Sequence, residues 1–158
     1  MAQDDWQRRL IAIEDRQSIT DLINAYAWHF DRNEPDLVGR LFCEDATVDY
    51  GPEVPPLVGR DAIVRQVRTG LATIFTATSH HISNIRITFD DDDHAHGEAY
   101  LYAWHRYRDG SPDGYLWGQY HNRFRRTADG WRIASLVLQA ANSIDFHRDA
   151  LHPVERKA

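Results

Sequence analysis

The sequence has little of what stabilises small secreted proteins or binds structural zinc. Its single cysteine, Cys43, excludes an intramolecular disulfide and a four-thiolate zinc site. No apolar run approaches the roughly 20 residues of a membrane span, and the opening MAQDDWQRRL lacks the apolar stretch of a signal peptide. The 18 basic residues are outnumbered by 24 acidic ones, which argues against a nucleic-acid partner. These absences predict a reduced, cytoplasmic protein that binds neither a membrane nor nucleic acid.

Common catalytic and cofactor motifs are missing as well. The sequence has no Gly-x-Ser-x-Gly elbow, no phosphate-binding loop and no dinucleotide fingerprint. His94 and His96 follow a run of four aspartates, but no third metal ligand is apparent near them. We therefore expect neither a cofactor nor a metal.

Histidine, in contrast, is abundant. The chain has nine histidines among 158 residues, a length that fits one domain. A domain of this size buries roughly two thirds of its unfolded surface. Histidine titrates near neutrality and is the usual proton-transfer group in enzymes, so some of these residues are candidates for catalysis.

The first half of the chain has helical periodicity. Apolar residues recur at helical spacing through residues 4–32, and Ser18 with Asp21 resembles a capping box that would break this helix near residue 17. Pro35 is placed to start a second helix whose apolar face includes Leu41 and Phe42. A short strand at residues 46–50 and a third helix at residues 59–75 follow.

The second half is rich in strands separated by turn sequences. Four strands are expected, at residues 79–89, 95–108, 115–126 and 131–143. Residues 147–158 form a polar tail, expected to be a short helix or disordered. Helices followed by strands indicate an α+β fold. We expect one domain over residues 1–146, a cone of curved antiparallel sheet closed by three N-terminal helices around a pocket.

A few polar residues fall in apolar contexts that face this pocket. Asp31 ends the apolar stripe of the first helix, where burial of an unpaired carboxylate is costly. Tyr26 lies on the same side of the helix, and Tyr50 ends the first strand. His105 lies mid-strand among aromatic residues. The sequence alone does not decide between two roles for His105: packing beneath those aromatic residues, or catalysis.

Alternation along the first long strand leaves its orientation ambiguous. His80, Ile82 and Asn84 point to one side, whereas His81 and Ile85, with three further residues, point to the other. Periodicity alone favours the His81 side as the core face.

Four segments of the chain, in register, resemble a known family. They are AYAWHFDRNEPDLVGRLF, ATVDY, TSHHISNIRITF and LYAWHRYRDG, and a closing hairpin NRFRRTADGWRI adds a further match. Over residues 10–146 the sequence resembles the SnoaL-like branch of the nuclear transport factor 2-like superfamily, and within it the scytalone dehydratases. The implied fold is the cystatin-like α+β cone.

The resemblance implies a set of catalytic residues. It places the catalytic carboxylate at Asp31, a tyrosine at Tyr50 and histidines at His80 and His105. Tyr26 matches a functional tyrosine of related bile-acid dehydratases. This choice of His80 conflicts with the alternation, which a β-bulge that exchanges the two faces would reconcile.

The recognition positions match the dehydratases less well. Phe30 stands where they have a tyrosine, and Gly118 and Tyr120 stand where they have serine and asparagine. The substrate is therefore expected to differ. The substrate-binding residues that we expect are Phe30, Trp28, Asn84, Trp104, Gly118, Tyr120 and Asn142, and Phe42 and Trp117 are further candidates for an aromatic lining.

The implied function is that of a cofactor-independent dehydratase, a lyase that eliminates water β to a carbonyl of a cyclic, hydrophobic substrate through an enolate. Alternatives are a dehydrohalogenase, a steroid or bile-acid dehydratase or an isomerase on the same His/Asp site. Non-catalytic alternatives are a ligand-binding module and the small subunit of a ring-hydroxylating dioxygenase. An outer sheet face that needs covering predicts a homo-oligomer. The dehydratases that the sequence resembles are trimers, whereas other relatives are dimers. We therefore expect a trimer in preference to a dimer.

The other histidines have less support. His81 and His121 are undecided. Surface or bystander positions are expected for His29, His94, His96, His147 and His152.

Overall fold

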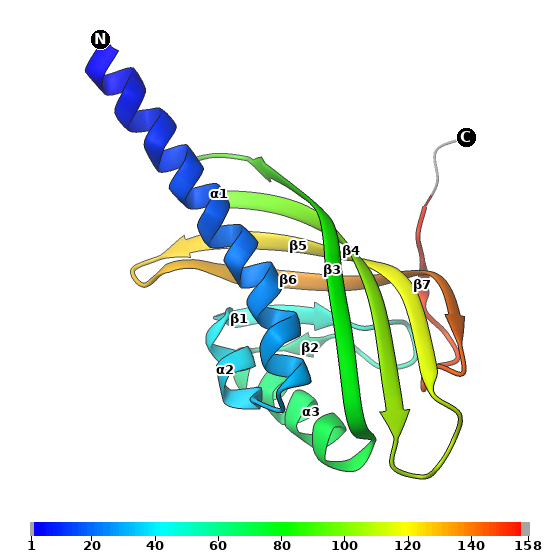
Figure 1. Ribbon diagram of the computed structural model, residues 1–158. Helices are drawn as coiled ribbons and strands as arrows, with labels where there is room; N and C mark the ends of the chain where they lie inside the picture. Colours follow the sequence, from blue (N-terminus) through cyan, green and yellow to red (C-terminus); the bar gives the residue numbers. More distant parts are fainter. Residues whose placement is uncertain (1, 156–158) are drawn as a thin grey trace.

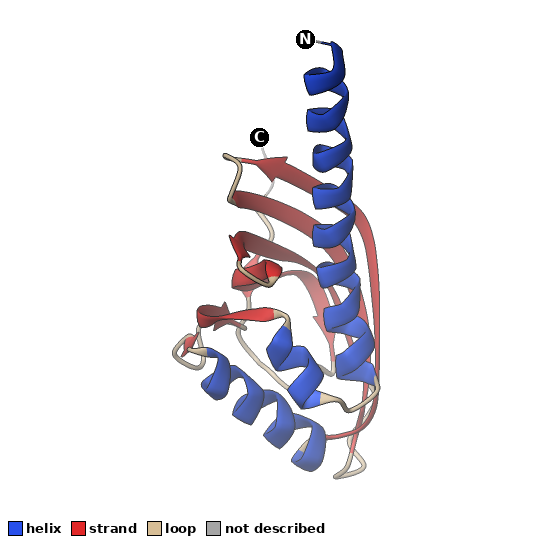
Figure 2. Ribbon diagram, turned by 90° about the vertical axis from the view of Figure 1, so that its left-hand side faces the viewer, coloured by secondary structure: helices blue, strands red, loops and turns tan. Residues whose placement is uncertain are grey.

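A computed structural model describes residues 2–155, with side chains from residue 5 onward. Three helices and seven strands make up the fold (Figures 1 and 2). The helices are α1 (Ala2–Asp31), α2 (Pro35–Arg40) and α3 (Arg60–Thr73). The strands are β1 (Phe42–Asp49), β2 (Leu57–Val58), β3 (Phe75–Phe89), β4 (His94–Tyr107), β5 (Gly114–Thr127), β6 (Gly130–Ile144) and β7 (His152–Pro153).

The strands form one curved, unclosed sheet in the order β2-β1-β6-β5-β4-β3. The four long strands β3 to β6 pair antiparallel, as expected, whereas β1 and β7 each pair with β6 in parallel. The sheet curves around the C-terminal half of α1 and toward α3 (Figure 2). The α+β class and the cystatin-like architecture are confirmed, and the cone is open along one side.

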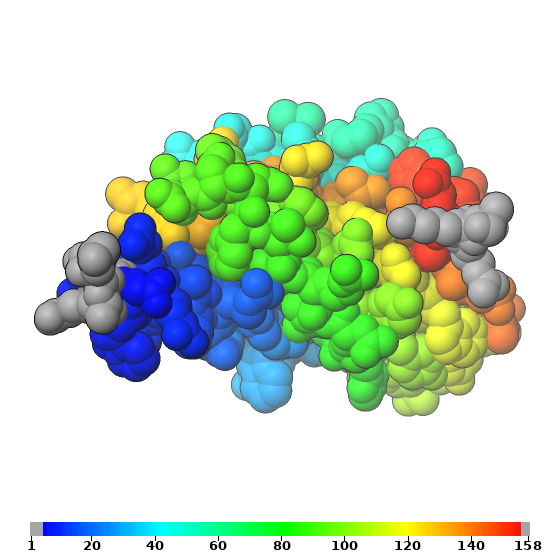
Figure 3. Space-filling model, turned by 90° about the horizontal axis from the view of Figure 1, so that it is seen from above, coloured from blue at the N-terminus to red at the C-terminus, as the bar shows by residue number. Residues whose placement is uncertain are grey.

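The first helix is continuous, as the periodicity of residues 4–32 predicts, and the alternative of a break near residue 17 is not observed. Ser18 Oγ donates to the Glu14 carbonyl oxygen at 2.9 Å, which occupies its hydroxyl within the helix instead of capping a new one. Only the second half of α1 packs into the core, through residues such as Ile19 and Ile23. The first half extends past the sheet beside the β3–β4 hairpin (Figures 1 and 3). Trp6, in this half, is exposed.

Strand β3 contains the bulge that reconciles the two interpretations of its histidines. The pairing register with β4 shifts between Ser83 and Arg86, and Asn84 within this interval adopts a left-handed φ of 50°. His80 therefore faces inward on one side of the bulge while Ile87 is buried on the other. Sequence alternation favours the opposite orientation because it assumes an uninterrupted pleat.

Two further predictions are corrected at element ends. Phe42 belongs to β1, which begins four residues before the predicted strand, and not to the helix before it. The tail is not a short helix or disordered over its described residues, because β7 pairs with β6 and the Val154 N–H donates to the Ala140 carbonyl oxygen at 3.0 Å. Within residues 2–155, no helix combines the length and apolar character that crossing a membrane requires.

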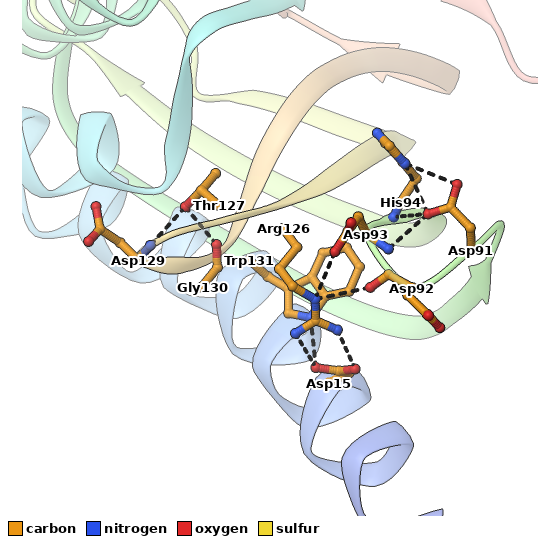
Figure 4. A network of polar contacts seen from close by, with 10 residues as sticks. All are labelled: Asp15, Asp91, Asp92, Asp93, His94, Arg126, Thr127, Asp129, Gly130 and Trp131. Atoms are coloured by element: carbon orange, nitrogen blue, oxygen red, sulfur yellow. Dashed lines mark hydrogen bonds and ion pairs between the residues drawn. The ribbon is translucent and has the colours of Figure 1, made fainter. Parts of the chain in front are cut away.

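One partly buried carboxylate ties α1 to the β5–β6 hairpin. Asp15 accepts hydrogen bonds from Arg126 Nη1 and Nη2 at 2.9 and 2.6 Å and from Trp131 Nε1 at 2.9 Å (Figure 4). The hydrogen bond from Arg126 lowers the pKa of the Asp15 carboxyl, against the opposing effect of its burial. Bidentate pairs of this kind are the stronger class of ion pair.

Replacing Asp15 by alanine is expected to lower the free energy of unfolding by about 1–3 kcal/mol, because it leaves the Arg126 and Trp131 donors without their acceptor. Urea unfolding at neutral pH measures the loss. The matched control is Asp36→Ala, which removes an exposed carboxylate paired with Arg68 and should cost at most about 1 kcal/mol. Equal losses for the two variants would contradict this account of the α1 attachment.

Candidate active site

A cavity lies between the helices and the inner face of the sheet. Its empty volume, including the space at the open mouth, is about 620 Å³. Its walls are mainly apolar and come from α1, α3, the strands β3 to β6 and the segment after β6. Six of the predicted site residues line it: Tyr26, Phe30, Tyr50, His80, His105 and Tyr120.

The predicted carboxylate and histidine meet at this cavity. Asp31 is the last residue of α1, and its Oδ1 lies 2.6 Å from His80 Nδ1. The same carboxylate accepts the His80 backbone N–H on Oδ2 at 2.7 Å and the Thr78 hydroxyl on Oδ1 at 2.8 Å. Three donors thus fix the carboxylate, and the carboxylate fixes the imidazole ring.

This contact determines which nitrogen of His80 carries the proton. Burial raises the pKa of the Asp31 carboxyl, but hydrogen bonds and charge from His80, with the Thr78 hydroxyl, outweigh burial and hold that pKa below its usual range. The carboxylate is therefore ionised near neutral pH and can only accept, so Nδ1 of His80 is the donor. In the neutral ring, Nε2 is left as a base on a side chain that lines the cavity.

His105 lies against His80 and is uncharged. Its ring centroid is 5.1 Å from that of His80 with the planes nearly perpendicular, and the residue is 3% exposed. Its Nδ1 is buried without a hydrogen-bond partner among the described residues. Burial, followed by the charges of His80 and His147, lowers the pKa of His105 to about 3. His105 thus brings a neutral imidazole to the cavity at physiological pH.

A pair of tyrosine hydroxyls forms a second polar group in the cavity. The hydroxyl oxygens of Tyr26 and Tyr50 are 2.7 Å apart, and the ring of Tyr120 meets that of Tyr26 edge-on at 5.5 Å. Burial raises the pKa of all three phenols, so they remain protonated hydrogen-bond donors. Either hydroxyl of the Tyr26–Tyr50 pair can direct its proton toward a bound oxygen.

Several predicted substrate-binding residues lie elsewhere. Trp28 is 62% exposed. It follows Tyr26 by two residues, a rotation of about 200° around the helix axis, so its side chain points away from the cavity. Trp104 points to the outer face, where Nε1 donates to Asp113 Oδ2 at 3.0 Å. Asn84 is exposed in the β3 bulge, and Asn142 is exposed near the end of β6. None of these four side chains lines the cavity.

Three other candidates also lie outside the lining. Gly118 is buried on β5 between two lining residues, but a side chain there would collide with the Gln139 carbonyl oxygen. Phe42 is fully buried in the core against Tyr26, and Trp117 is on the outer face.

The site also contains residues that sequence reasoning missed. Thr78 donates to Asp31, and its position two residues before His80 on the same side of the strand is a signal that could have revealed it. Phe146, His147 and Arg148 line the cavity from the segment after β6. The sequence predictions place His147 and Arg148 in the polar tail and assign no role to Phe146. Because His147 lines the cavity, its predicted bystander position is corrected.

The remaining histidines are engaged away from the cavity. His94 and His96 contact Asp91 and Asp90 respectively, and within the described residues no group of three or more candidate ligands is arranged to hold a metal. His29 contacts Glu34 and His152 contacts Asp49.

Comparison with known families agrees with this fold. A model of the SnoaL-like domain matches residues 12–137. The chain belongs to the SnoaL-like family. The predicted resemblance is therefore confirmed at the level of the family. A search of curated proteins finds no significant match.

Solved structures of other proteins superpose over most of the chain. A Novosphingobium aromaticivorans protein, provisionally named a scytalone dehydratase, is 32% identical, with a TM-score of 0.86 over 94% of this chain and 98% of the other. A second protein from that organism, provisionally named an aromatic ring hydroxylase, is 30% identical, with a TM-score of 0.77 over 82% and 91%. The hexachlorocyclohexane dehydrochlorinase of Novosphingobium barchaimii shares the fold, at 16% identity and a TM-score of 0.80 over 94% and 99%.

Proposed function

We propose that this SnoaL-like protein is a cofactor-independent hydro-lyase that eliminates water β to a carbonyl of a cyclic, hydrophobic substrate. The observation that carries the proposal is the 2.6 Å contact between Asp31 and His80 at the wall of an apolar cavity. A histidine oriented by an ionised carboxylate is an arrangement suited to proton transfer. The 32%-identical relative provisionally named a scytalone dehydratase supports the same class of reaction.

The first step is removal of the proton from the carbon next to the carbonyl. His80 Nε2 takes this proton, and the C–H electron pair moves onto the carbonyl oxygen to give an enolate. Asp31 stabilises the imidazolium that forms, because its carboxylate lies against the Nδ1–H. Neighbouring His105 remains neutral and so does not oppose that charge.

The enolate needs donors at its oxygen. The Tyr26–Tyr50 pair supplies O–H groups whose raised pKa keeps the phenols protonated, so they stabilise the anion by hydrogen bonding. In an apolar cavity such bonds act in a lower effective dielectric than in water, which strengthens them.

The second step expels the hydroxyl group. The enolate electrons re-form the carbonyl and the new carbon–carbon double bond while the β C–O bond breaks. His80, now protonated, or a proton relay through His105, gives the leaving hydroxide a proton, and water is released. No electron acceptor or donor is required, in keeping with a cofactor-independent reaction.

Non-catalytic roles account less well for this arrangement. A simple binding module requires the cavity but has no need for Asp31 and His80 to be within hydrogen-bond reach, and a purely structural subunit of a ring-hydroxylating enzyme does not need the buried pair. Co-purification of a larger catalytic chain would favour the structural role. Steady turnover by the isolated protein would exclude it as the whole function.

Dehydration, dehydrohalogenation and isomerisation could all begin with the same proton removal. A panel of cyclic ketones that carry β-hydroxyl, β-chloro or no leaving group separates them. The expected result is that the β-hydroxy ketones give the α,β-unsaturated product fastest, which ultraviolet absorbance follows. Absence of turnover for every β-hydroxy ketone, with turnover of the β-chloro compounds, would replace dehydration by dehydrohalogenation.

Replacing Tyr50 by phenylalanine is expected to lower kcat by about 10- to 100-fold. A sole oxyanion donor is typically worth about 10²–10³-fold, and the remaining Tyr26 hydroxyl should reduce that loss. The matched control is Tyr100→Phe, which removes a hydroxyl from the outer sheet face and should leave kcat unchanged. Equal kinetics for Tyr50→Phe and the wild type would remove Tyr50 from the mechanism.

We further propose that the protein acts as a homo-oligomer, with a trimer favoured over a dimer. Exposed Tyr100 and Trp117 on the outer sheet face support association. Light scattering after size-exclusion chromatography gives the mass and distinguishes trimer, dimer and monomer.

A further inference from the structure

The cavity has one positively charged lining residue that the proposed elimination does not use. Among the described residues, Arg148 is the only arginine or lysine in the cavity wall. It lies in the segment after β6, and its guanidinium carbon is 5.7 Å from the centroid of the Tyr50 ring. The charge therefore lies beside one of the two hydroxyl-bearing residues proposed to hold the enolate.

Arg148 has no carboxylate partner within the described part of the chain. Other arginines, such as Arg126 and Arg125, have bidentate contacts with aspartates. Glu53, in the loop that faces the Arg148 segment, uses Oε1 to accept the backbone N–H groups of Asp149 and Ala150. Glu53 thus anchors the backbone next to Arg148 through its contacts with these two N–H groups.

The position of the charge corresponds to the mouth of the cavity. Gln66 of α3 lines the cavity and is nevertheless exposed, so the opening lies between α3 and the segment that carries Arg148. Other walls of the cavity are apolar, with Leu116 and Leu138 among them. His80 and the two tyrosines, Tyr26 and Tyr50, also line the cavity. Arg148 is partly buried there, and its guanidinium donors have no carboxylate partner among the described residues, so they are free to bind an anionic group of a ligand in the cavity.

We propose that Arg148 is a specificity-determining residue that selects substrates with a carboxylate on the part of the ring system nearest the cavity mouth. A guanidinium forms two parallel hydrogen bonds with a carboxylate, a geometry that lysine or an amide does not reproduce. The apolar ring system fills the cavity and the carboxylate pairs with Arg148. Because the carboxylate would bind in the cavity proposed for elimination, this assignment rests on the proposed function.

Binding of two isosteric probes tests the assignment without turnover. Calorimetric titration at pH 7 compares 2-naphthoate, which is ionised, with 2-naphthamide, which is neutral and of similar shape. The wild type is expected to bind the carboxylate at least about tenfold more tightly, as a charge-assisted bidentate pair allows. Arg148→Gln should abolish this preference while leaving the Kd for the amide within about twofold. Arg148→Lys should restore part of it.

The control is Arg123→Gln, which removes the same charge from an exposed side chain of β5 and should retain the wild-type preference. If Arg148→Gln binds neither probe, Arg148→Met, which keeps the apolar stem against Tyr50, provides the same comparison. The assignment is overturned if the wild type binds neither probe or binds both equally, or if the neutral variants keep the preference.

Failure of this inference is distinguishable from failure of the proposed elimination. If the two probes bind equally and neutral β-hydroxy ketones are turned over normally, the proposed preference for a carboxylate is rejected and the proposed elimination is retained. If the protein prefers the carboxylate probe but turns over no substrate, the role of Arg148 in anion selection is retained and the proposed elimination is rejected.

Discussion

Replacing His80 by alanine is expected to lower kcat for elimination by about 10²–10⁴-fold, the range for loss of a general acid–base group. Its Nε2 is proposed to take the α-proton, and no other histidine of the cavity contacts the Asp31 carboxylate. Steady-state kinetics on the β-hydroxy ketone that turns over fastest measure the change. The loss should fall mainly on kcat, because the imidazole acts on the transition state more than on bound substrate.

The neighbouring residue gives a closely matched control. His81 is exposed on the opposite face of β3, where its ring lies 5.8 Å from that of Tyr102. His81→Ala should keep wild-type kinetics. If His81→Ala loses as much activity as His80→Ala, the orientation of the dyad is incorrect. Unchanged turnover in His80→Ala removes the base from the mechanism.

Replacing Asp31 by asparagine is the second change with a large expected effect, a loss in kcat of about 10²–10⁴-fold. The carboxylate accepts hydrogen bonds on both oxygens, from His80 Nδ1 and Thr78 on Oδ1 and from the His80 backbone on Oδ2. An amide has one accepting oxygen, so its NH₂ group must face a donor. The imidazolium also loses the negative charge beside it. Single-turnover kinetics separate this loss from slower substrate binding.

The same variant has a stability readout. Because the folded-state pKa of Asp31 lies below its ordinary value of about 3.8, its ionised form contributes stability that is fully present above that value. The contribution is lost as the pH falls through the folded-state pKa. Urea unfolding between pH 7 and pH 3 should therefore show a gap between the wild type and Asp31→Asn that narrows at the acid end. A gap that widens on acidification would contradict the ionised, hydrogen-bonded carboxylate.

A matched control for Asp31→Asn is Asp21→Asn on the same helix. Asp21 accepts a hydrogen bond from Gln17 Nε2 at 2.8 Å on the exposed side of α1. Its replacement changes the net charge equally and should leave both kcat and the acid-side stability gap near wild-type values. A similar activity loss there would indicate an effect of charge on the whole helix instead of on the dyad.

Sequence reasoning located the polar centre of the site because family motifs fix residues in register. Asp31 and His80 are 49 positions apart and meet at hydrogen-bond distance. Helical spacing also placed Tyr26 and Phe30 on the cavity side of α1. Local periodicity sufficed for these residues because the second half of α1 is regular.

Face assignment in the strands was less predictable. A single bulge between Ser83 and Arg86 reverses which side chains point inward, and a period-two pattern cannot locate it. In β4, by contrast, ordinary alternation gives the correct faces. His105 faces inward, so its neighbour Trp104 lies on the outer face. Its aromatic character was the misleading signal.

The segment after β6 could not be placed from sequence because it lacks periodicity. Phe146, His147 and Arg148 reach the cavity only through long-range contacts that hold this segment in place. Those contacts include Glu53 with the Asp149 and Ala150 N–H groups and the pairing of β7 with β6. Such contacts depend on the completed sheet and leave no local pattern.

The most direct test of the central claim is to follow the α-proton itself. Proton NMR in D₂O records loss of the α-C–H signal and appearance of the alkene for a turned-over cyclic β-hydroxy ketone, with wild type and with His80→Gln. The expected result is rapid loss of the α-proton with the wild type and a rate reduced by about 10²–10⁴-fold with the variant. Loss of the α-proton at the wild-type rate with His80→Gln would contradict the account.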